Sequence, residues 1–261
     1  PANLGYHLSY AFDLKGPVMT INTSCSSSLA AVHVAKNALK QGDCNVAVVA
    51  GVNLNLFPYW EEEAPDYVVR STKYRCSPFD ESADGIIGGE GVAAIVVKRL
   101  SDAIKDNNHI HAVLKGSSIS SDGASNGMQV PNPDAQSKAI MDALDDAKLS
   151  FNDIDFVEAH GAGTQVGDLL EVEGLKKAYL QKSTKTTECQ LGSIKSNFGH
   201  MGDAAGIAGL IKAVLSIEKR TVPGLNHFAA ENPKINFKET PFKVSSENKT
   251  FDEHKILSAG V

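Results

Sequence analysis

One cysteine and two histidines occur in three similar local settings along the chain. Cys25 lies in the run Ser24-Cys25-Ser26-Ser27-Ser28, between an apolar stretch and an alanine-rich one. His160 follows an apolar stretch, His200 ends a polar loop that follows another, and both adjoin glycines. A cysteine thiolate is a strong nucleophile, and an imidazole donates or accepts a proton near neutral pH. Nucleophilic chemistry at Cys25, assisted by histidine, is therefore the first hypothesis for these three side chains.

The surroundings of Cys25 favour the thiolate. The apolar run Val18–Thr23 predicts a strand, and Ser27–Leu39 has helical apolar spacing, so Cys25 would stand at a sharp strand-to-helix turn. A helix N-terminus stabilises negative charge by about 0.3–1 kcal/mol, and by about 2 kcal/mol when partly buried. The neighbouring serines are candidate caps and donors for the first helical turn. The structural alternative is a capped helix that merely carries a cysteine.

Each of the two histidines lies in a loop segment that contains glycine. His160 is followed by Gly161-Ala162-Gly163-Thr164, and His200 ends the segment Lys195-Ser196-Asn197-Phe198-Gly199-His200. Glycines allow tight turns and close approach of a ligand to the backbone. A single histidine in such a loop is more often structural, but two of them together with Cys25 make coincidence a weaker explanation.

Short apolar runs alternate with helical patterns through the whole chain. We expect further strands at 45–54, 91–98, 111–120, 153–159 and 190–195, and helices near 101, at 135–147, 168–180 and 203–218. This alternation indicates an α/β fold with buried sheets. The Ala- and Gly-rich stretch Ala204–Ala213 should lie between two layers.

Composition is that of an ordinary globular protein. The 261 residues are 42% apolar and 21% charged, with a net charge of −6. This acidic balance argues against nucleic-acid or membrane partners. No apolar stretch reaches the roughly 20 residues that a membrane helix needs, and no signal segment opens the chain, so a cytoplasmic location is expected. The four cysteines form no C-x-x-C pair, so no metal site is predicted from them.

The three motifs together resemble those of β-ketoacyl synthases, particularly the ketosynthase domains of modular polyketide synthases and related fatty-acid synthases. Three further segments are similar to the same family: Phe12–Pro17, Ser77–Asp80 and Asp84–Gly91. The glycines of the last segment could also suggest a nucleotide loop, but no P-loop lysine follows them.

The resemblance implies a thiolase-like layered α/β/α/β/α fold built of two similar halves, acting as a homodimer. Residues 1–98 would be the end of the N-terminal half, which holds the nucleophile. Residues 110–261 would be the C-terminal half, which holds both histidines. The family's first part and a Phe- and Gly-rich loop expected just past Val261 are not in this sequence. We therefore expect a partial domain with exposed apolar edges.

The resemblance also implies a role for each residue. Cys25 would take an acyl chain from the phosphopantetheine arm of an acyl carrier protein and condense it with a decarboxylating malonyl group. His160 and His200 would donate hydrogen bonds to the enolate, and Lys195 would orient a histidine. Thr164 and Asn197 would contact the arm as substrate-binding residues. No cofactor is expected in this domain, and its partners would be the carrier protein and other polyketide synthase domains in the same polypeptide.

Some positions depart from the family pattern. Ala162 stands where the family usually has a threonine that bonds the pantetheine arm, a loss of about 0.5–1.5 kcal/mol. Asn22, Leu169 and Gly202 also differ, but none of them removes a reacting group.

Three alternatives stay open at the level of sequence. The first is a non-elongating relative that only transfers acyl chains. The second is a Cys–His hydrolase with Asn197 orienting one imidazole, and the third is a scaffold. The remaining histidines, including His33, His109 and His111, are interpreted as structural or solvated. Tyr59-Trp60 and the loop Gly123–Pro131 are candidate tunnel-lining segments.

Overall fold

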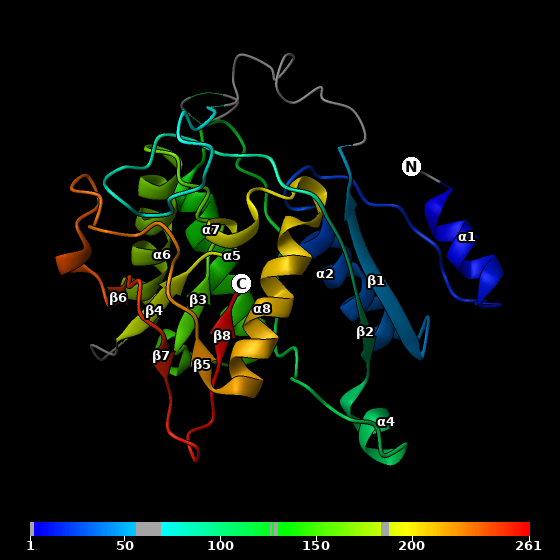
Figure 1. Cartoon of the computed structure of the whole chain (residues 1–261). Coiled ribbons are helices and arrows are strands. Elements are labelled where there is room, and N and C mark those ends of the chain that lie inside the picture. Colours follow the sequence, from blue (N-terminus) through cyan, green and yellow to red (C-terminus); the bar gives the residue numbers. More distant parts are fainter. Residues whose placement is uncertain (1–2, 56–68, 126, 128–129, 184–187) are drawn as a thin grey trace.

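Helices and sheets alternate in layers across the molecule (Figure 1). The computed structural model describes residues 3–55, 69–125, 127, 130–183 and 188–261. Tyr59 and Trp60 lie outside the described residues, as does part of the loop Gly123–Pro131. From one side to the other, the layers are a helix pair, a parallel sheet, a second helix pair and a two-stranded sheet. The helices are α5 (Pro133–Ala147) with α6 (Gly167–Lys182), and α2 (Ser27–Gln41) with α8 (Ala205–Lys219).

The parallel sheet carries the histidine half of the candidate site. Its order is β6-β4-β3-β8, and every neighbouring pair is parallel. Phe156 pairs with Gln190 and with Ala259. The strands are β3 (Phe156–Glu158), β4 (Cys189–Gly192), β6 (Phe242–Lys243) and β8 (Ala259–Gly260). Because parallel strands end at the same edge, the loops after β3 and β4 lie side by side.

The second sheet is an antiparallel pair. β1 (Val46–Asn53) and β2 (Gly91–Lys98) pair over their full lengths, from Val46 opposite Lys98 to Asn53 opposite Gly91. Successive side chains alternate between the two faces. One face packs on α2 and α8, where Val49 is buried. The other face is open to solvent.

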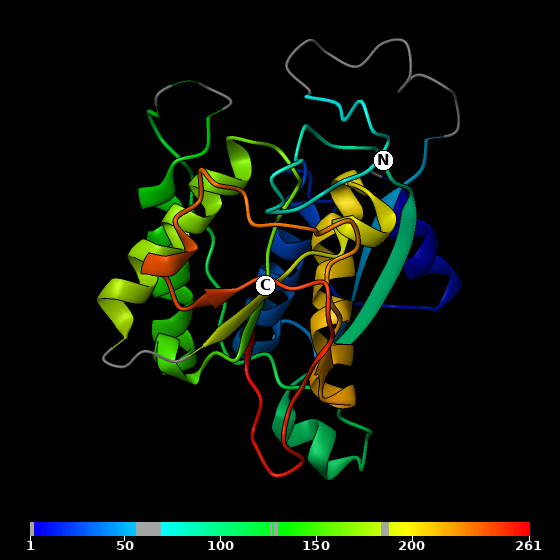
Figure 2. The same ribbon diagram turned by 60° about the vertical axis from the view of Figure 1, so that its left-hand side comes forward.

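Helix α8 packs between the two sheets (Figure 2). On one side, its fully buried Ile207 packs with Val32 of α2 and Val49 of β1. On the other side, Ala213 packs with Phe156 of β3. The expectation that the Ala- and Gly-rich stretch Ala204–Ala213 lies between two layers is confirmed. A separate core, which includes Phe79, Leu144, Val157 and Leu175, fills the space between the parallel sheet and the α5–α6 pair.

Most expected elements form, with two exceptions. The strand expected at Val18–Thr23 is wrong, because no described segment forms a ladder with it and only an isolated bridge joins Thr23 to Cys25. The strand expected at His111–Ser120 is also wrong, since that segment makes no β-ladder with the described chain. An apolar run becomes a strand only when a neighbouring backbone supplies the hydrogen bonds. The strand predicted at 190–195 stops at Gly192, because Lys195 begins the short helix α7 (Lys195–Phe198).

The remaining elements are short. β5 (Thr221–Val222) pairs antiparallel with β7 (Lys249–Thr250). Helices α1 (Leu4–Ala11) and α4 (Leu100–Lys105) lie near the margins of the molecule (Figure 1). Three 3₁₀ turns complete the described chain: η1 (Phe151–Asp153), η2 (Gly202–Ala204) and η3 (Phe237–Glu239).

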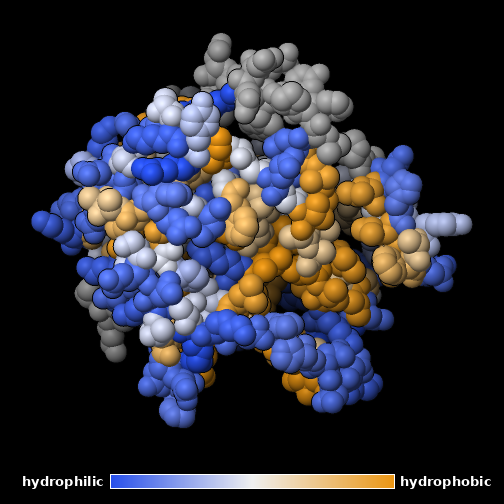
Figure 3. Space-filling view, in the orientation of Figure 1, coloured by the Kyte–Doolittle hydropathy of each residue, from blue (hydrophilic) through white to orange (hydrophobic). Residues whose placement is uncertain are grey.

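The surface carries a large apolar region on the side of β1 and β2 (Figure 3). Val48 and Val96 face each other across the strand pair and are 50% and 69% exposed. Among the described helices, none combines the length and the apolar character needed to cross a membrane.

Candidate active site

Cys25 lies just before helix α2. Ser24, immediately before it, has a positive φ of 58°, which turns the chain sharply into the helix. The Cys25 side chain is half-buried. Cys25 thus has the helix-start position that the sequence predicts, although a turn without strand pairing leads into it.

The three serines after Cys25 do not cap their own helix in the expected way. Ser26, at the N-cap, makes no side-chain capping bond and donates to the Thr23 carbonyl at 2.8 Å. The Ser27 hydroxyl accepts the Thr23 N–H at 2.9 Å. The Ser28 hydroxyl accepts the N–H of Ile207, at the start of α8, at 3.0 Å. These serines therefore tie the nucleophile turn to itself and to α8, which begins shortly after His200 in the chain.

His160 is held by a carboxylate and by a buried amine. Its backbone N–H donates to Glu171 at 2.6 Å, and the Gly161 N–H donates to the second oxygen of the same carboxylate at 2.8 Å. Its carbonyl accepts from Lys195 Nζ at 2.6 Å. The loop after β3 is therefore fixed from two sides through its backbone, which leaves the imidazole available to a substrate.

His200 is fixed through its backbone groups and through one ring nitrogen. Its N–H donates to the Ile87 carbonyl at 2.8 Å, and its carbonyl accepts the Gly89 N–H at 2.9 Å. Its ring Nδ1 lies 3.0 Å from the Gly202 N–H and accepts it. An Nδ1 that accepts carries no proton, so the neutral ring holds its proton on Nε2. His200 is thus a hydrogen-bond donor at Nε2.

The two imidazoles lie together. Their ring centroids are 5.4 Å apart, with the planes at 72°. Although part of the His160 side chain reaches solvent, the surrounding protein disfavours its charged form and lowers its pKa well below 6.5, and Lys195 acts in the same direction. Burial, followed by the charge of Lys195, lowers the pKa of His200 to about 4. Both rings are neutral at physiological pH.

Lys195 connects the three motifs. It is 4% exposed, and burial lowers the pKa of its ammonium, while the carboxylates of Glu171 and Glu158 oppose that shift. Cys25 is near enough to interact electrostatically with it. An ammonium in this position favours neutral rings at His160 and His200.

Sequence reasoning missed Glu171 as a functional-site residue. It lies three residues after Asp168 in the first turns of α6, so both carboxylates face the His160 loop. Asp168 accepts the N–H groups of Phe79 at 2.7 Å and Gly163 at 3.0 Å. Burial, with a smaller contribution from Glu171, raises the pKa of Asp168 to about 7. The acidic spacing at the start of an expected helix was the available signal.

The glycine-rich segment Asp84–Gly91 positions the His200 loop. A Cβ at Gly89 would lie 2.1 Å from the Phe198 carbonyl oxygen, and one at Gly199 would lie 2.9 Å from the Ile87 oxygen. Only glycine allows the two backbones to approach so closely. The segment therefore has a structural role here, with no P-loop lysine.

The two expected substrate contacts differ in their surroundings. The Thr164 hydroxyl already makes a local hydrogen bond: it accepts the N–H of Gly167, at the start of α6, at 3.2 Å. Asn197 is exposed on α7, where its side chain contacts Ser196 at 3.2 Å. The role of both residues in substrate binding stays a prediction.

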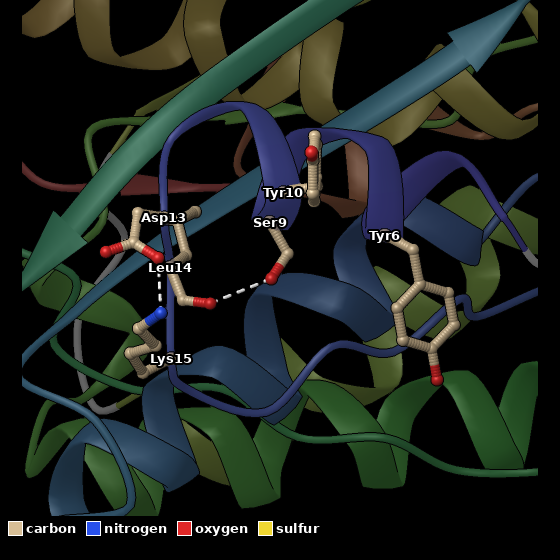
Figure 4. Close-up of a pocket in the computed structure, with 6 residues that line it drawn as sticks. All are labelled: Tyr6, Ser9, Tyr10, Asp13, Leu14 and Lys15. Carbon is tan, nitrogen blue, oxygen red and sulfur yellow. Dashed lines mark hydrogen bonds and ion pairs between the residues drawn. The ribbon is translucent and has the colours of Figure 1, made fainter.

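A separate hollow lies beside α1 (Figure 4). Lys15 pairs there with Asp13, and the Ser9 hydroxyl donates to the Leu14 carbonyl at 2.8 Å. Only α1 and the turn after it line this hollow, and Cys25, His160 and His200 do not. It is therefore distinct from the candidate active site.

Two family profiles match the chain. The profile described as "Beta-ketoacyl synthase, N-terminal domain" matches residues 4–103, and "Beta-ketoacyl synthase, C-terminal domain" matches residues 111–229. Among curated proteins, the chain is 40% identical over 247 residues to polyketide synthase PksL of Bacillus subtilis, covering 95% of this chain and 5% of that protein. It is 38% identical over 250 residues to polyketide synthase PksM of the same organism, covering 96% and 6%.

Solved structures agree with this match. The oxazolomycin ketosynthase domain of Streptomyces albus superposes with a TM-score of 0.92 at 36% identity, covering 95% of this chain and 44% of that one. The module 6 ketosynthase of the bacillaene synthase of Bacillus subtilis gives 0.92 at 35%, covering 96% and 45%. The fold is thus the thiolase-like ketosynthase fold, and the chain spans less than half the length of these solved domains.

Proposed function

Because this chain belongs to the β-ketoacyl synthase family and is similar to ketosynthase domains of polyketide synthases, we propose that it performs a decarboxylative Claisen condensation. Cys25 accepts an acyl chain from the phosphopantetheine arm of an acyl carrier protein, and a second carrier protein brings a malonyl group. The product is a β-ketoacyl chain, one unit longer, in polyketide or fatty-acid biosynthesis.

The steps define what the protein must stabilise. The Cys25 sulfur attacks the acyl thioester, the bond to the pantetheine sulfur breaks, and that thiol leaves with a proton. The malonyl group then loses carbon dioxide, and the released electron pair forms an enolate. The enolate carbon attacks the Cys25 thioester, and the Cys25 thiolate leaves. The critical charge is the one that develops on the malonyl thioester oxygen.

The pair of neutral imidazoles is the observation that carries this proposal. His160 and His200 have ring centroids 5.4 Å apart, and the proton of His200 lies on Nε2 because Nδ1 accepts the Gly202 N–H. Two preorganised N–H donors suit one enolate oxygen, and a donor of this kind contributes about 2.7–4 kcal/mol to the transition state. A hydrolase would need one imidazole as base and would leave the second without a role.

The surrounding residues complete the proposal. Lys195 holds the His160 loop through the His160 carbonyl. Burial, with the charge of Lys195 acting in the same direction, keeps both rings neutral. Thr164 and Asn197 contact the arm of the carrier protein. The domain binds no cofactor of its own, since the arm brings both substrates. It functions as a homodimer in the cytoplasm, within a polypeptide that carries other polyketide synthase domains.

Loading the chain with an acyl group from acyl carrier protein and then adding malonyl carrier protein tests the proposal. We expect acylation at Cys25 by mass spectrometry, release of carbon dioxide and a β-ketoacyl product. His200→Gln should keep acylation and lower carbon dioxide release about 10²–10³-fold, the typical effect of one lost oxyanion donor. His33→Gln, on α2, is the matched control and should change neither step.

Two outcomes would contradict the proposal. Acylation of the unaltered chain without carbon dioxide release would identify a domain that only transfers acyl chains. Absence of acylation at Cys25 would reject the nucleophile.

A further inference from the structure

Three side chains with metal-binding chemistry meet on the surface, away from the candidate active site. His109 and His111 lie in the segment after α4, and Glu218 lies in the last turn of α8. His109 Nε2 is 3.6 Å and His111 Nδ1 is 3.3 Å from Glu218 Oε1. Within the described ranges, this is the one group of three or more His, Cys, Asp or Glu ligand atoms that lie within 4.8 Å of one another.

The two imidazole rings converge beside Glu218. The ring centroids of His109 and His111 are 4.4 Å apart, with the planes at 79°. Both rings are more than half exposed, whereas Glu218 is 32% exposed. The arrangement leaves an open side toward solvent, through which an ion and its waters can enter.

The spacing and the charges fit a transition-metal ion. Tetrahedral zinc with bonds of roughly 2.0–2.2 Å places its ligand atoms about 3.3–3.6 Å apart. The separations of 3.3 and 3.6 Å between the histidine nitrogens and Glu218 Oε1 agree with that value. Glu218 supplies a carboxylate oxygen beside the two imidazole nitrogens, a donor set that zinc accepts. The C-terminal end of α8 carries a partial negative charge, which also favours a cation there.

We propose that His109, His111 and Glu218 form a binding site for one divalent ion of the zinc class, with water completing the coordination. Imidazole ligands select zinc, copper or nickel over magnesium. The site lies at the seam between the two family matches, which end at 103 and begin at 111. A bound ion therefore ties the connecting segment to α8, a structural role that is independent of the condensation.

Calorimetric titration with zinc chloride tests this site. A Cys25→Ala background removes the active-site thiol as a competing ligand. We expect one binding event, weakened at least tenfold by His111→Ala and by Glu218→Gln. His254→Ala removes another exposed imidazole and should leave the affinity unchanged, and magnesium chloride should give no comparable binding. Far-UV circular dichroism checks that each variant is folded.

Two results would overturn the proposal. One is the absence of zinc binding by the folded background protein. The other is zinc binding of equal strength in the His111→Ala variant, which would assign the ion to other residues.

Discussion

At the scale of single residues, the site depends on which groups carry protons. Loss of contact with water lowers the pKa of His200 and, together with the charge of Lys195, that of the partly exposed His160. The same effect raises the pKa of Cys76 and takes that of Cys189 to about 12. Burial disfavours the charged form of every group, so bases become weaker and acids become weaker too. The chain therefore combines neutral imidazoles with unreactive buried thiols.

The first prediction concerns the charge state of the two active-site imidazoles. With a pKa of about 4, His200 gains its proton only as the pH falls toward that value, and His160 follows the same direction. Both rings should stay neutral from pH 8 down to pH 5.5. Histidine Cε1 signals followed by NMR, assigned with His160→Gln and His200→Gln, measure this. A signal of either ring with a midpoint near 6.5 would contradict it.

The second prediction concerns cysteine reactivity. Iodoacetamide at pH 7.5 should label Cys25 several-fold faster than Cys44, which is also half-buried but follows α2 instead of preceding it. Cys76 and Cys189 should react slowest, because both are buried with raised pKa values. A time course of peptide mass spectrometry gives the four rates. Equal rates at Cys25 and Cys44 would remove the support for an activated nucleophile.

At the scale of elements, a buried ion pair joins the parallel sheet to its neighbouring helix. Glu158, at the end of β3, lies 2.7 Å from Lys212 of α8, and the two side chains are 3% and 12% exposed. Burial raises the pKa of Glu158, and Lys212 opposes that shift. Because Glu158 immediately precedes Ala159 and His160, this contact also positions the histidine loop.

The third prediction follows from this pair. Removing one partner leaves a buried charge uncompensated, so Glu158→Gln or Lys212→Met should each lower the free energy of unfolding by about 3–5 kcal/mol. The double variant should lose much less than the sum. Urea unfolding of the four proteins completes the cycle. As a control, Lys138→Ala breaks an exposed pair with Asp142 and should lower the free energy of unfolding by at most about 0.5 kcal/mol. If the double variant lost the full sum of the two single losses, Glu158 and Lys212 would not be coupled.

The fourth prediction uses the two faces of the β1–β2 sheet. Val48 is 50% exposed on the open face, and the next residue, Val49, is 4% exposed on the packed face. Val48→Thr should change the free energy of unfolding by less than about 0.5 kcal/mol. Val49→Thr should lower it by about 1–3 kcal/mol, because it buries a hydroxyl. Urea unfolding distinguishes the two, and equal losses would mean that the open face is covered in solution.

At the scale of the whole molecule, the contact between α2 and α8 brings the cysteine and histidine segments together. The Ser28 hydroxyl accepts the Ile207 N–H, and a Cβ at Gly206 would lie 2.6 Å from Leu29 Cγ. The absence of a side chain at Gly206 is thus what allows the two helices to approach.

The fifth prediction tests this approach with two glycines of one helix. Alanine gains about 1 kcal/mol over glycine in any helix interior. In Gly209→Ala the added Cβ would lie 3.3 Å from Glu158 Cγ, so this substitution should leave the free energy of unfolding nearly unchanged. Gly206→Ala must displace Leu29, so it should lower the free energy of unfolding by about 1–3 kcal/mol and slow the acylation of Cys25. Equal stability of the two variants, measured by thermal unfolding, would show that the helices are not held this closely.

The sequence by itself determined the three motif segments, the α/β class and most helices. These depend on local signals: apolar spacing of 3.6 for α2 and α5, an apolar run rich in small residues for α8, and continuous apolar runs for β1 and β2. The strands predicted at Val18–Thr23 and His111–Ser120 were wrong. A strand requires a partner backbone, and local apolar spacing does not specify one.

Only the tertiary structure decided how the site is charged and held. The proton of His200 lies on Nε2 because Nδ1 accepts the Gly202 N–H. Glu171 and Lys195 hold the backbone of the His160 loop. The surface group of His109 and His111 is completed by Glu218, more than a hundred residues away in the chain. Burial and through-space charge set these properties, and both arise from atoms that are distant in sequence and adjacent only after folding.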